Sequence, residues 1–464
     1  MINKKNNQNN RVFFISIALI LFCLLNVFTI ITIKDFGIYL SFLLVILPIS
    51  ILTFSLGFDK YGYFDCIVII FSLLFFIIAP IVQLNNSNLP NTLDIRYNLI
   101  LKTNLYVGIF FISYVLFKLS LKSKKSKIQF KFEIKNIKAI NMIMGTIFII
   151  VFILNLKYIF NAIILRQYSE NISLSADLIK RKYIFSFPVY LFVYNIYISK
   201  VKNNNKSSKL KIKNIFLLSI IFILLVLVKN PFLEKRNSIG PLYLALIFFL
   251  LFKYINLRRF FMIMLIVQLI LFPISTIFTH STQGIFDILK SIDINYLTQT
   301  FKNEFTTLHY DAWSNFMATI DYVSNNGYSY GVQFIGAILF FIPRTIWINK
   351  PIGSGQLIGN YLMANYGMWF NNLSNPFISE GYINFGVIGV LIFAFILAYL
   401  GKIVRECIKS NGYLIFIGIY VSIYMMFFIR GDFMSAFSYV VGFIGATVIT
   451  PLILDKIISF IKLK

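Results

Sequence analysis

The chain has little charge and few cysteines, and each shortage excludes a class of protein. Of its 464 residues 13% are charged, whereas 58% are hydrophobic. A soluble chain of this length would need far more charge to cover its core, so lipid is the expected solvent. Cys23 and Cys66 fall in apolar runs and Cys407 in an expected cytoplasmic loop. This placement predicts neither a disulfide framework nor a cysteine-based metal site.

Long apolar runs take the place of the missing charge. A helix that crosses a hydrocarbon core of about 30 Å needs roughly 20 such residues. Because no β-barrel alternation is seen, we expect an all-α polytopic membrane bundle of about twelve transmembrane helices. The predicted spans are 12–33, 36–57, 66–84, 99–117, 139–157, 184–199, 214–228, 239–252, 260–279, 380–400, 412–429 and 434–454.

The net charge of +26 is explained by orientation in a membrane. With both termini in the cytoplasm, the basic clusters Lys122–Lys138 and Lys200–Lys213 fall on the cytoplasmic side, as the positive-inside rule requires. We therefore expect a multi-pass protein of a bacterial inner membrane. Nucleic-acid binding is not expected, because no folded domain outside the membrane would carry it.

Two expected outer segments are longer than simple connections. In the first, Lys157–Tyr183, the run Ser173–Asp177 is typical of a helix N-cap and precedes basic residues at 180–182. The second, 280–376, contains the apolar stretch 332–342, which is too short to span and predicts a re-entrant or interfacial helix. The chain is thus expected to divide into a bundle of residues 1–279, the large outer loop 280–376, and a bundle of residues 377–464.

Four basic residues lie at expected outer helix ends: Arg236, Arg344, Lys350 and Arg430. If they converge, they can hold one anion, and the planar fork of arginine suits phosphate oxygens. The alternative is local pairing, of Arg430 with Asp432 and of Arg236 with Glu234.

The same region resembles a known family. The motifs Pro343–Pro351 and Glu380–Gly389 resemble the outer-loop signature and the following segment of Wzy-type oligosaccharide repeat-unit polymerases. Arg236 before an apolar span and the sequence Arg430-Gly-Asp432 before the last span are similar to that family as well. The resemblance covers roughly residues 230–440.

The resemblance implies an activity on the outer face of the membrane. Such enzymes join undecaprenyl-diphosphate-linked oligosaccharides into surface polysaccharide and release undecaprenyl diphosphate. They are metal-independent membrane glycosyltransferases with a GT-C-like bundle, and they use no cofactor. A flippase and a chain-length regulator are the implied protein partners.

The leaving diphosphate gains charge as the anomeric bond breaks, and fixed guanidinium groups would stabilise it in the transition state. The expected diphosphate ligands are Arg344 first, then Arg236, Arg430 and Lys350.

The acceptor hydroxyl needs a general base. Its motif favours Glu380, and His309 and Asp311 follow, the histidine for its convenient pKa. The alternatives are that Glu380 only pairs with an arginine and that His309 is a surface residue. Trp347, Asn384 and Asp432 are the expected sugar contacts, although the tryptophan could instead belong to an interfacial aromatic belt.

Two other functions use the same features. An O-antigen ligase would take the same donor but a lipid A–core acceptor, and His309 is compatible with it. A flippase or other secondary transporter would place charges or broken helices near the bilayer midplane, whereas the polar residues here collect at the outer ends.

Overall fold

A computed structural model describes residues 2–123, 132–165, 178–202, 212–231, 233–234, 236–271, 303–410 and 412–462. Within these ranges the regular secondary structure is helical, and no strand occurs. In the first half the elements are α1 (Ile2–Thr32), α2 (Phe36–Leu56), α3 (Tyr63–Leu73), η1 (Leu74–Ile78), α4 (Ala79–Asn85), α5 (Tyr97–Ser123), α6 (Ile137–Leu154), α7 (Leu156–Leu165), η2 (Leu178–Tyr183), η3 (Ile184–Ser186), α9 (Phe187–Lys202), α10 (Ile212–Val228), α11 (Arg236–Leu250), α12 (Leu257–Ile266) and η5 (Val267–Leu271). In the second half they are η6 (Leu308–Tyr310), α16 (Ala312–Asn326), α17 (Val332–Ile338), α18 (Ser354–Tyr366), α19 (Phe377–Lys409), α20 (Tyr413–Arg430), α21 (Phe433–Ile444), η7 (Gly445–Ile449) and α22 (Thr450–Ile461).

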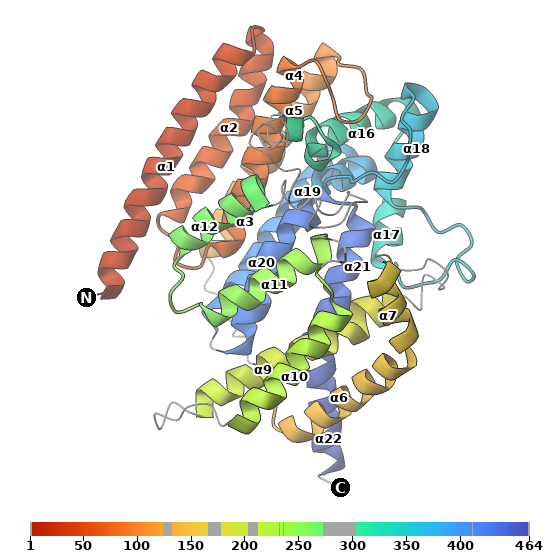
Figure 1. Cartoon of the computed structure of the whole chain (residues 1–464). Coiled ribbons are helices and arrows are strands. Elements are labelled where there is room, and N and C mark those ends of the chain that lie inside the picture. Colours follow the sequence, from red (N-terminus) through yellow and green to blue (C-terminus); the bar gives the residue numbers. More distant parts are fainter. Residues whose placement is uncertain are drawn as a thin grey trace.

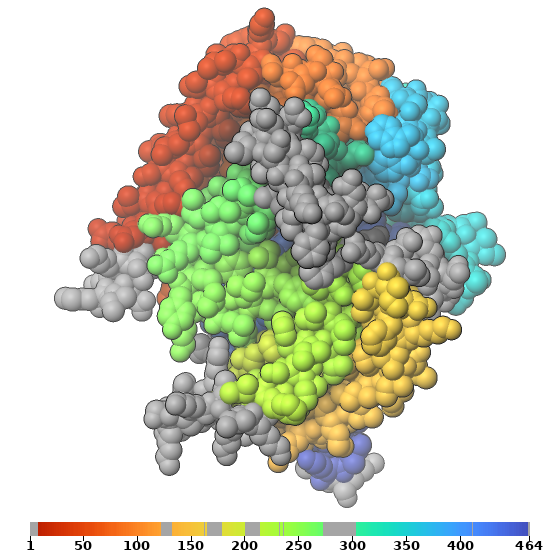
Figure 2. Space-filling model, in the orientation of Figure 1, coloured from red at the N-terminus to blue at the C-terminus, as the bar shows by residue number. Residues whose placement is uncertain are grey.

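Helices α19, α20 and α21 lie between the two ends of the molecule (Figure 1). The N-terminal helices α1, α2 and α5 occupy one side, and α6, α9, α10 and α22 occupy the opposite end. In the space-filling view, α11 and α12 lie on the surface between α1 and α6–α7 (Figure 2). Helix α20 is buried along nearly its whole length, so it forms the centre of the core.

Among the described residues, eight helical segments are long and apolar enough to cross a membrane, which makes the chain a polytopic membrane protein. They are Gln8–Thr32, Phe36–Leu56, Tyr63–Asn85, Tyr97–Leu121, Ile137–Leu154, Phe377–Lys409, Tyr413–Arg430 and Phe433–Ile461. The other four of the twelve predicted spans correspond to α9, α10, α11 and the α12–η5 helix, which are shorter within the described residues. The total of twelve therefore stays a prediction.

The short apolar stretch after residue 331 is a helix, as predicted, but only seven residues long. It packs against α21 and α19, with the Phe334 ring stacked on that of Phe433. In the other segment that was expected on the outer side, the described helix begins at Leu178, and the predicted N-cap at Ser173–Asp177 lies outside the described residues.

A sharp bend divides α19 near its start. Gly386 has φ +59°, a backbone conformation that favours glycine, and it interrupts the helix after Asn384. The bend brings Gly381 so close to Gly389 that a Cβ on Gly381 would stand 2.6 Å from the Gly389 carbonyl oxygen. The first two turns of α19, which carry Glu380, are thus held at an angle to the rest of the helix.

A buried ion cluster joins α3, α5 and α19 far along the bundle from Glu380. Lys118 Nζ lies 2.9 Å from Asp65 Oδ2, and Arg405 bonds to Asp59. Tyr114 donates a 2.6 Å hydrogen bond to Asp65, so the buried charges are paired and hydrogen-bonded. Cys407 lies in the same part of α19 and is buried, which corrects its expected place in a loop.

Candidate active site

The turn Arg430-Gly-Asp432 between α20 and α21 connects two polar clusters. The predicted turn is confirmed: α20 ends at Arg430, and Asp432 is the N-cap of α21, where its Oδ1 accepts a 3.0 Å hydrogen bond from Ser435 N. Arg430 does not pair with Asp432. Its guanidinium points instead towards the start of α16, whereas Asp432 contacts the start of α18.

The first cluster surrounds Arg430. Its Nη2 donates to the Leu308 carbonyl at 2.6 Å and lies 3.2 Å from Asp311 Oδ1. Asp311 is buried and also accepts hydrogen bonds from Ser374 Oγ at 2.7 and 2.8 Å and from Asn315 Nδ2 at 2.9 Å. Burial nevertheless raises the pKa of the Asp311 carboxyl, against the lowering effect of the arginine. Asp311 thus holds the guanidinium in one orientation.

Arg236 and Glu304 complete the arginine cluster. The Arg236 and Arg430 guanidinium groups lie close enough to repel each other, and both attract the Glu304 carboxylate. Glu304 is buried, and its Oε1 has no hydrogen bond within the described part of the chain. Two arginines 194 positions apart in the sequence therefore lie near each other. The expected local partner of Arg236, Glu234, forms its ion pair with Arg181 at 3.1 Å.

Sequence reasoning missed Glu304, because no motif surrounds it. Burial raises the pKa of this carboxyl, although Arg236 and Arg430 act to lower it. An acid in an expected outer segment rich in aromatic and apolar residues was the available signal.

Replacing Glu304 by glutamine should raise Tm at pH 7, and the gain should disappear near pH 4.5, the ordinary pKa of the group. The folded chain binds this proton more tightly than the unfolded chain, so the wild type loses stability as pH rises through the raised pKa. Glutamine does not titrate in this pH range. Glu304 Oε1 has no hydrogen-bond partner among the described residues, so the change breaks no hydrogen bond at that atom. Thermal unfolding in detergent across this pH range measures the effect. A gain that grows towards acid pH would contradict the role of burial.

The second cluster is acidic and lies on the Asp432 side of the turn. Glu380 is buried, and Ser354 Oγ, at the first residue of α18, donates a hydrogen bond to its Oε1. Asp432 Oδ2 accepts from Gly355 N at 3.0 Å and lies 3.5 Å from the same Ser354 hydroxyl. One hydroxyl thus lies between two carboxylates. A Cβ at Gly353 would stand 2.9 Å from Asp432 Oδ1, so the small residue permits the approach.

The side chains of Arg344 and Lys350 bond to backbone carbonyls of the loop that carries them. Arg344 donates to the carbonyls of Lys350 at 2.5 Å and Pro351 at 3.1 Å. Lys350 is buried and donates to the carbonyls of Phe340 at 2.6 Å and Ile342 at 2.9 Å. Burial lowers the pKa of Lys350, and nearby Arg344 adds to the effect. The described bonds of both side chains therefore order residues 340–351, and Arg344 remains exposed.

The remaining predicted residues lie around these clusters. Trp347 is half-buried in the Arg344 loop. Asn384 is fully buried: its Nδ2 donates to the Glu380 carbonyl at 2.7 Å, and its Oδ1 accepts from Phe334 N at 3.3 Å. It thereby connects α19 to α17. His309 is half-buried beside Leu308, whose carbonyl binds Arg430.

One family model matches the part of the chain that contains this turn. Residues 372–463 match the family model described as O-antigen polysaccharide polymerase Wzy. This region belongs to the Wzy family. The Wzy region, residues 372–463, contains Glu380, Arg430 and Asp432. It therefore includes both carboxylates of the acidic cluster and one of the two arginines of the arginine cluster. Arg236, Arg344 and the other predicted residues before position 372 lie outside it.

No curated protein and no solved structure matches the chain. Within the residues that the structure describes, no group of three or more histidine, cysteine, aspartate or glutamate side chains could hold a metal ion.

Proposed function

We propose that the chain polymerises undecaprenyl-diphosphate-linked oligosaccharide repeat units on the outer face of a bacterial inner membrane. The observation that carries the proposal is the convergence of Arg236 and Arg430 beside a turn that lies in the Wzy region. Both termini are then cytoplasmic, and the large outer loop of 280–376 supplies α16, α17 and α18 to the site. The chain crosses the membrane about twelve times in this arrangement.

The arginine cluster suits the leaving group. The acceptor hydroxyl oxygen attacks the anomeric carbon of the donor, and the bond to the diphosphate oxygen breaks with its electron pair. Arg430 and Arg236 would bind the diphosphate oxygens and neutralise the charge that develops there. Asp311 supports this role, because its buried carboxylate fixes one nitrogen of Arg430.

The acidic cluster suits the acceptor. Glu380 would take the proton of the attacking hydroxyl, and the Ser354 hydroxyl between Glu380 and Asp432 would orient the carboxylate. Asp432 and Trp347 are the proposed sugar contacts, and Asn384 positions the segment that carries Glu380. His309 and Asp311 are the alternative bases.

We expect Arg344→Ala to reduce kcat/KM by about 10–100-fold, because a guanidinium that orders the loop through two carbonyls is lost. Arg344→Lys should recover little of this, since an ammonium does not reproduce the fork. Arg344 and Lys350 would in addition provide positive charge near the diphosphate. Steady-state kinetics with a lipid-linked repeat unit measure the effect, and full activity of Arg344→Ala would exclude both roles.

The experiment that tests the function uses the purified chain in detergent with the lipid-linked repeat unit of its own strain. Size separation should show a ladder of multimers, and treatment with EDTA should leave the ladder unchanged, because guanidinium groups take the place of a metal at the diphosphate. A single unreacted band from folded protein would exclude the polymerase.

An O-antigen ligase is the second candidate, favoured by the position of His309 next to the carbonyl that binds Arg430. A ligase would transfer the glycan only when lipid A–core is added. A secondary transporter or flippase would give neither product.

A further inference from the structure

Gln83 belongs to the first bundle, but its side chain contacts the turn that supports Arg430. It lies on α4, at the expected outer end of a predicted span, and is completely buried. Its Nε2 donates hydrogen bonds to the carbonyls of Phe305 at 2.8 Å and Tyr310 at 2.9 Å. Because carbonyl oxygens can only accept, these two bonds fix the orientation of the amide. One nitrogen thus connects both ends of the turn 305–310.

This turn carries the groups that orient Arg430. The Leu308 carbonyl accepts from Arg430 Nη2, and Asp311, the residue after the turn, pairs with the same nitrogen. Within the described residues both hydrogen bonds of the guanidinium come from Nη2, and its buried Nε has none. A guanidinium has five N–H donors, so the turn orients the fork without occupying all of it. Leu308 lies between the two carbonyls that Gln83 binds, so the position of its own carbonyl depends on Gln83.

Phe75, on the same span as Gln83, supports the turn and the arginine together. Its ring stacks on that of Tyr310, with the ring centres 4.8 Å apart. The central guanidinium carbon of Arg430 lies 5.8 Å from the centre of the Phe75 ring, a distance at which an aromatic face attracts a cation. The span therefore contacts the turn through an amide and through a ring.

A break in the α-helix places these two side chains on one face of the span. Pro80 has no N–H to donate to the Phe76 carbonyl, and residues Leu74–Ile78 form a π-helical turn. Phe75 and Gln83 are eight residues apart, which corresponds to about 80° around an unbroken α-helix. The π-helical turn accommodates one extra residue, so the two side chains instead lie within about 20° of each other.

We propose that Gln83 is a positioning residue for Arg430. The inference rests on the proposed function, in which Arg430 neutralises the diphosphate as the anomeric bond breaks. Gln83 acts through the turn 305–310 and not on the substrate. A donor that stabilises developing charge must be oriented beforehand, because reorientation during the reaction would cost free energy. Gln83 and Phe75 lie outside the matched residues 372–463, so the first bundle completes the site of the Wzy region.

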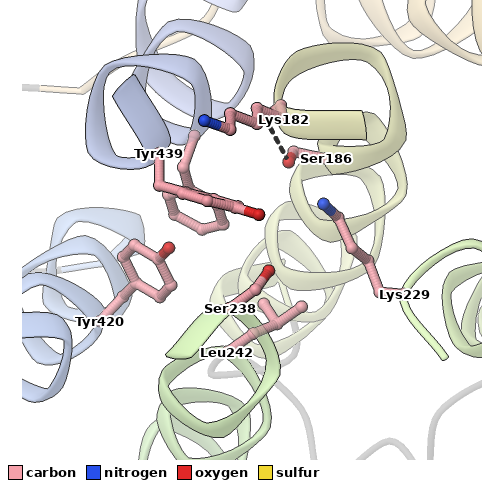
Figure 3. A pocket seen from close by; sticks show the side chains of 8 residues that line it. Lys182, Ser186, Lys229, Ser238, Leu242, Tyr420 and Tyr439 are labelled. Carbon is pink, nitrogen blue, oxygen red and sulfur yellow. Dashed lines mark hydrogen bonds between the residues drawn. The ribbon is translucent and has the colours of Figure 1, made fainter. Parts of the chain in front are cut away.

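A hydrogen bond of the same kind elsewhere provides the control. The Tyr243 hydroxyl, on α11, donates to the Lys229 carbonyl at 2.6 Å, so it also links a side chain to the backbone of another segment. Lys229 and Lys182 line a small cavity (Figure 3). Their ammonium groups bond to the Arg181 carbonyl and to Ser438 Oγ. Tyr243→Phe keeps the ring and removes only this hydroxyl.

Steady-state kinetics of the full chain with a lipid-linked repeat unit test the proposal. Gln83→Met keeps the length of the side chain and removes both donated bonds. We expect kcat to fall about 10–100-fold, as when a catalytic group is misplaced, and KM to stay within about threefold. Tyr243→Phe should leave kcat unchanged. Wild-type kcat in Gln83→Met, with the folded state verified by thermal unfolding, would overturn the proposal.

A second variant covers the case in which Gln83→Met does not fold. Gln83→Asn retains the amide but shortens its reach by one methylene, so it should show a smaller loss of kcat with KM again nearly unchanged. Wild-type kcat in this variant, when Gln83→Met is unfolded, would equally overturn the proposal.

Combination with Arg430→Gln separates positioning from general destabilisation. Because residues that act as one unit have non-additive effects, Gln83→Met should lower the kcat of the Arg430→Gln protein no further. A loss of stability alone would instead multiply the two effects. A full effect of Gln83→Met in the Arg430→Gln protein, or an equal fall of kcat in Tyr243→Phe, would refute the positioning role.

Binding of inorganic pyrophosphate, a mimic of the leaving group, gives a readout that needs no turnover. In calorimetry with the chain in phosphatidylcholine nanodiscs, Arg430→Gln should weaken binding at least about tenfold and Gln83→Met about three- to tenfold. The double variant should bind no more weakly than Arg430→Gln. Binding that depends on both residues, in a chain that makes no polymer, would reject the polymerase and keep the positioning role. Polymer formation at the wild-type rate by Gln83→Met would reject the positioning role and keep the polymerase.

Discussion

Arg430→Gln should lower kcat for polymerisation by at least about 10³-fold while the protein stays folded and inserted. Glutamine is uncharged, so it cannot neutralise a diphosphate or form an ion pair with the buried Asp311 carboxylate. Arg430→Lys should recover little, since an ammonium cannot bind two phosphate oxygens in the plane of a fork. Gel analysis of product length and single-turnover rates measures the effect.

The matched control for this change is Arg259→Gln. Arg259 is exposed near the start of α12, and its Nη1 donates to the Tyr254 carbonyl, so it does not belong to either cluster. Its removal should leave both product length and rate unchanged. Near-normal chain length in Arg430→Gln, with the folded state verified by thermal unfolding, would remove Arg430 from the diphosphate site.

Glu380→Gln should reduce kcat by about 10²–10⁴-fold, the range expected when a general base is lost. The change preserves shape and leaves an oxygen to accept the hydrogen bond of Ser354, so the start of α18 should stay in place. The neutral amide cannot take the proton of the acceptor hydroxyl. Ser354→Ala keeps the carboxylate but removes the hydroxyl that orients it, so its kcat should fall less than that of Glu380→Gln.

Helix α19 itself provides the control for Glu380. Glu406→Gln changes the same residue type near the far end of the helix, where Glu406 pairs with Lys409 at 2.8 Å. Surface pairs of this kind contribute little, so activity should remain at the wild-type level. If Glu380→Gln also remains fully active, the base is Asp311 or His309. Replacing each of these two residues by an uncharged one and measuring kcat then identifies which of them is the base.

Much of the fold follows from the sequence because membrane helices are defined by local composition. Each predicted span coincides with a helix in its described part, with bounds that differ by up to ten residues. A helix was also predicted over 332–342 and a turn at 430–432; the structure has the helix over 332–338 and the turn as predicted. The Wzy resemblance was confirmed by a family match over residues 372–463, a region that contains Glu380 and the Arg-Gly-Asp turn.

The partners of the charged residues were decided by the tertiary structure. The sequence left open whether Arg430 pairs with Asp432 and Arg236 with Glu234. In the structure Arg430 pairs with Asp311, 119 positions away, and Glu234 pairs with Arg181. The bend at Gly386 and the contact of Ser354 with Glu380 likewise depend on how α18 and α19 pack. Apolar length selects which segments become helices, because lipid requires each backbone to satisfy its own hydrogen bonds. The apolar length of a segment does not determine which helix ends pack together. That packing places Glu304 beside two arginines and Lys229 in a cavity with Lys182.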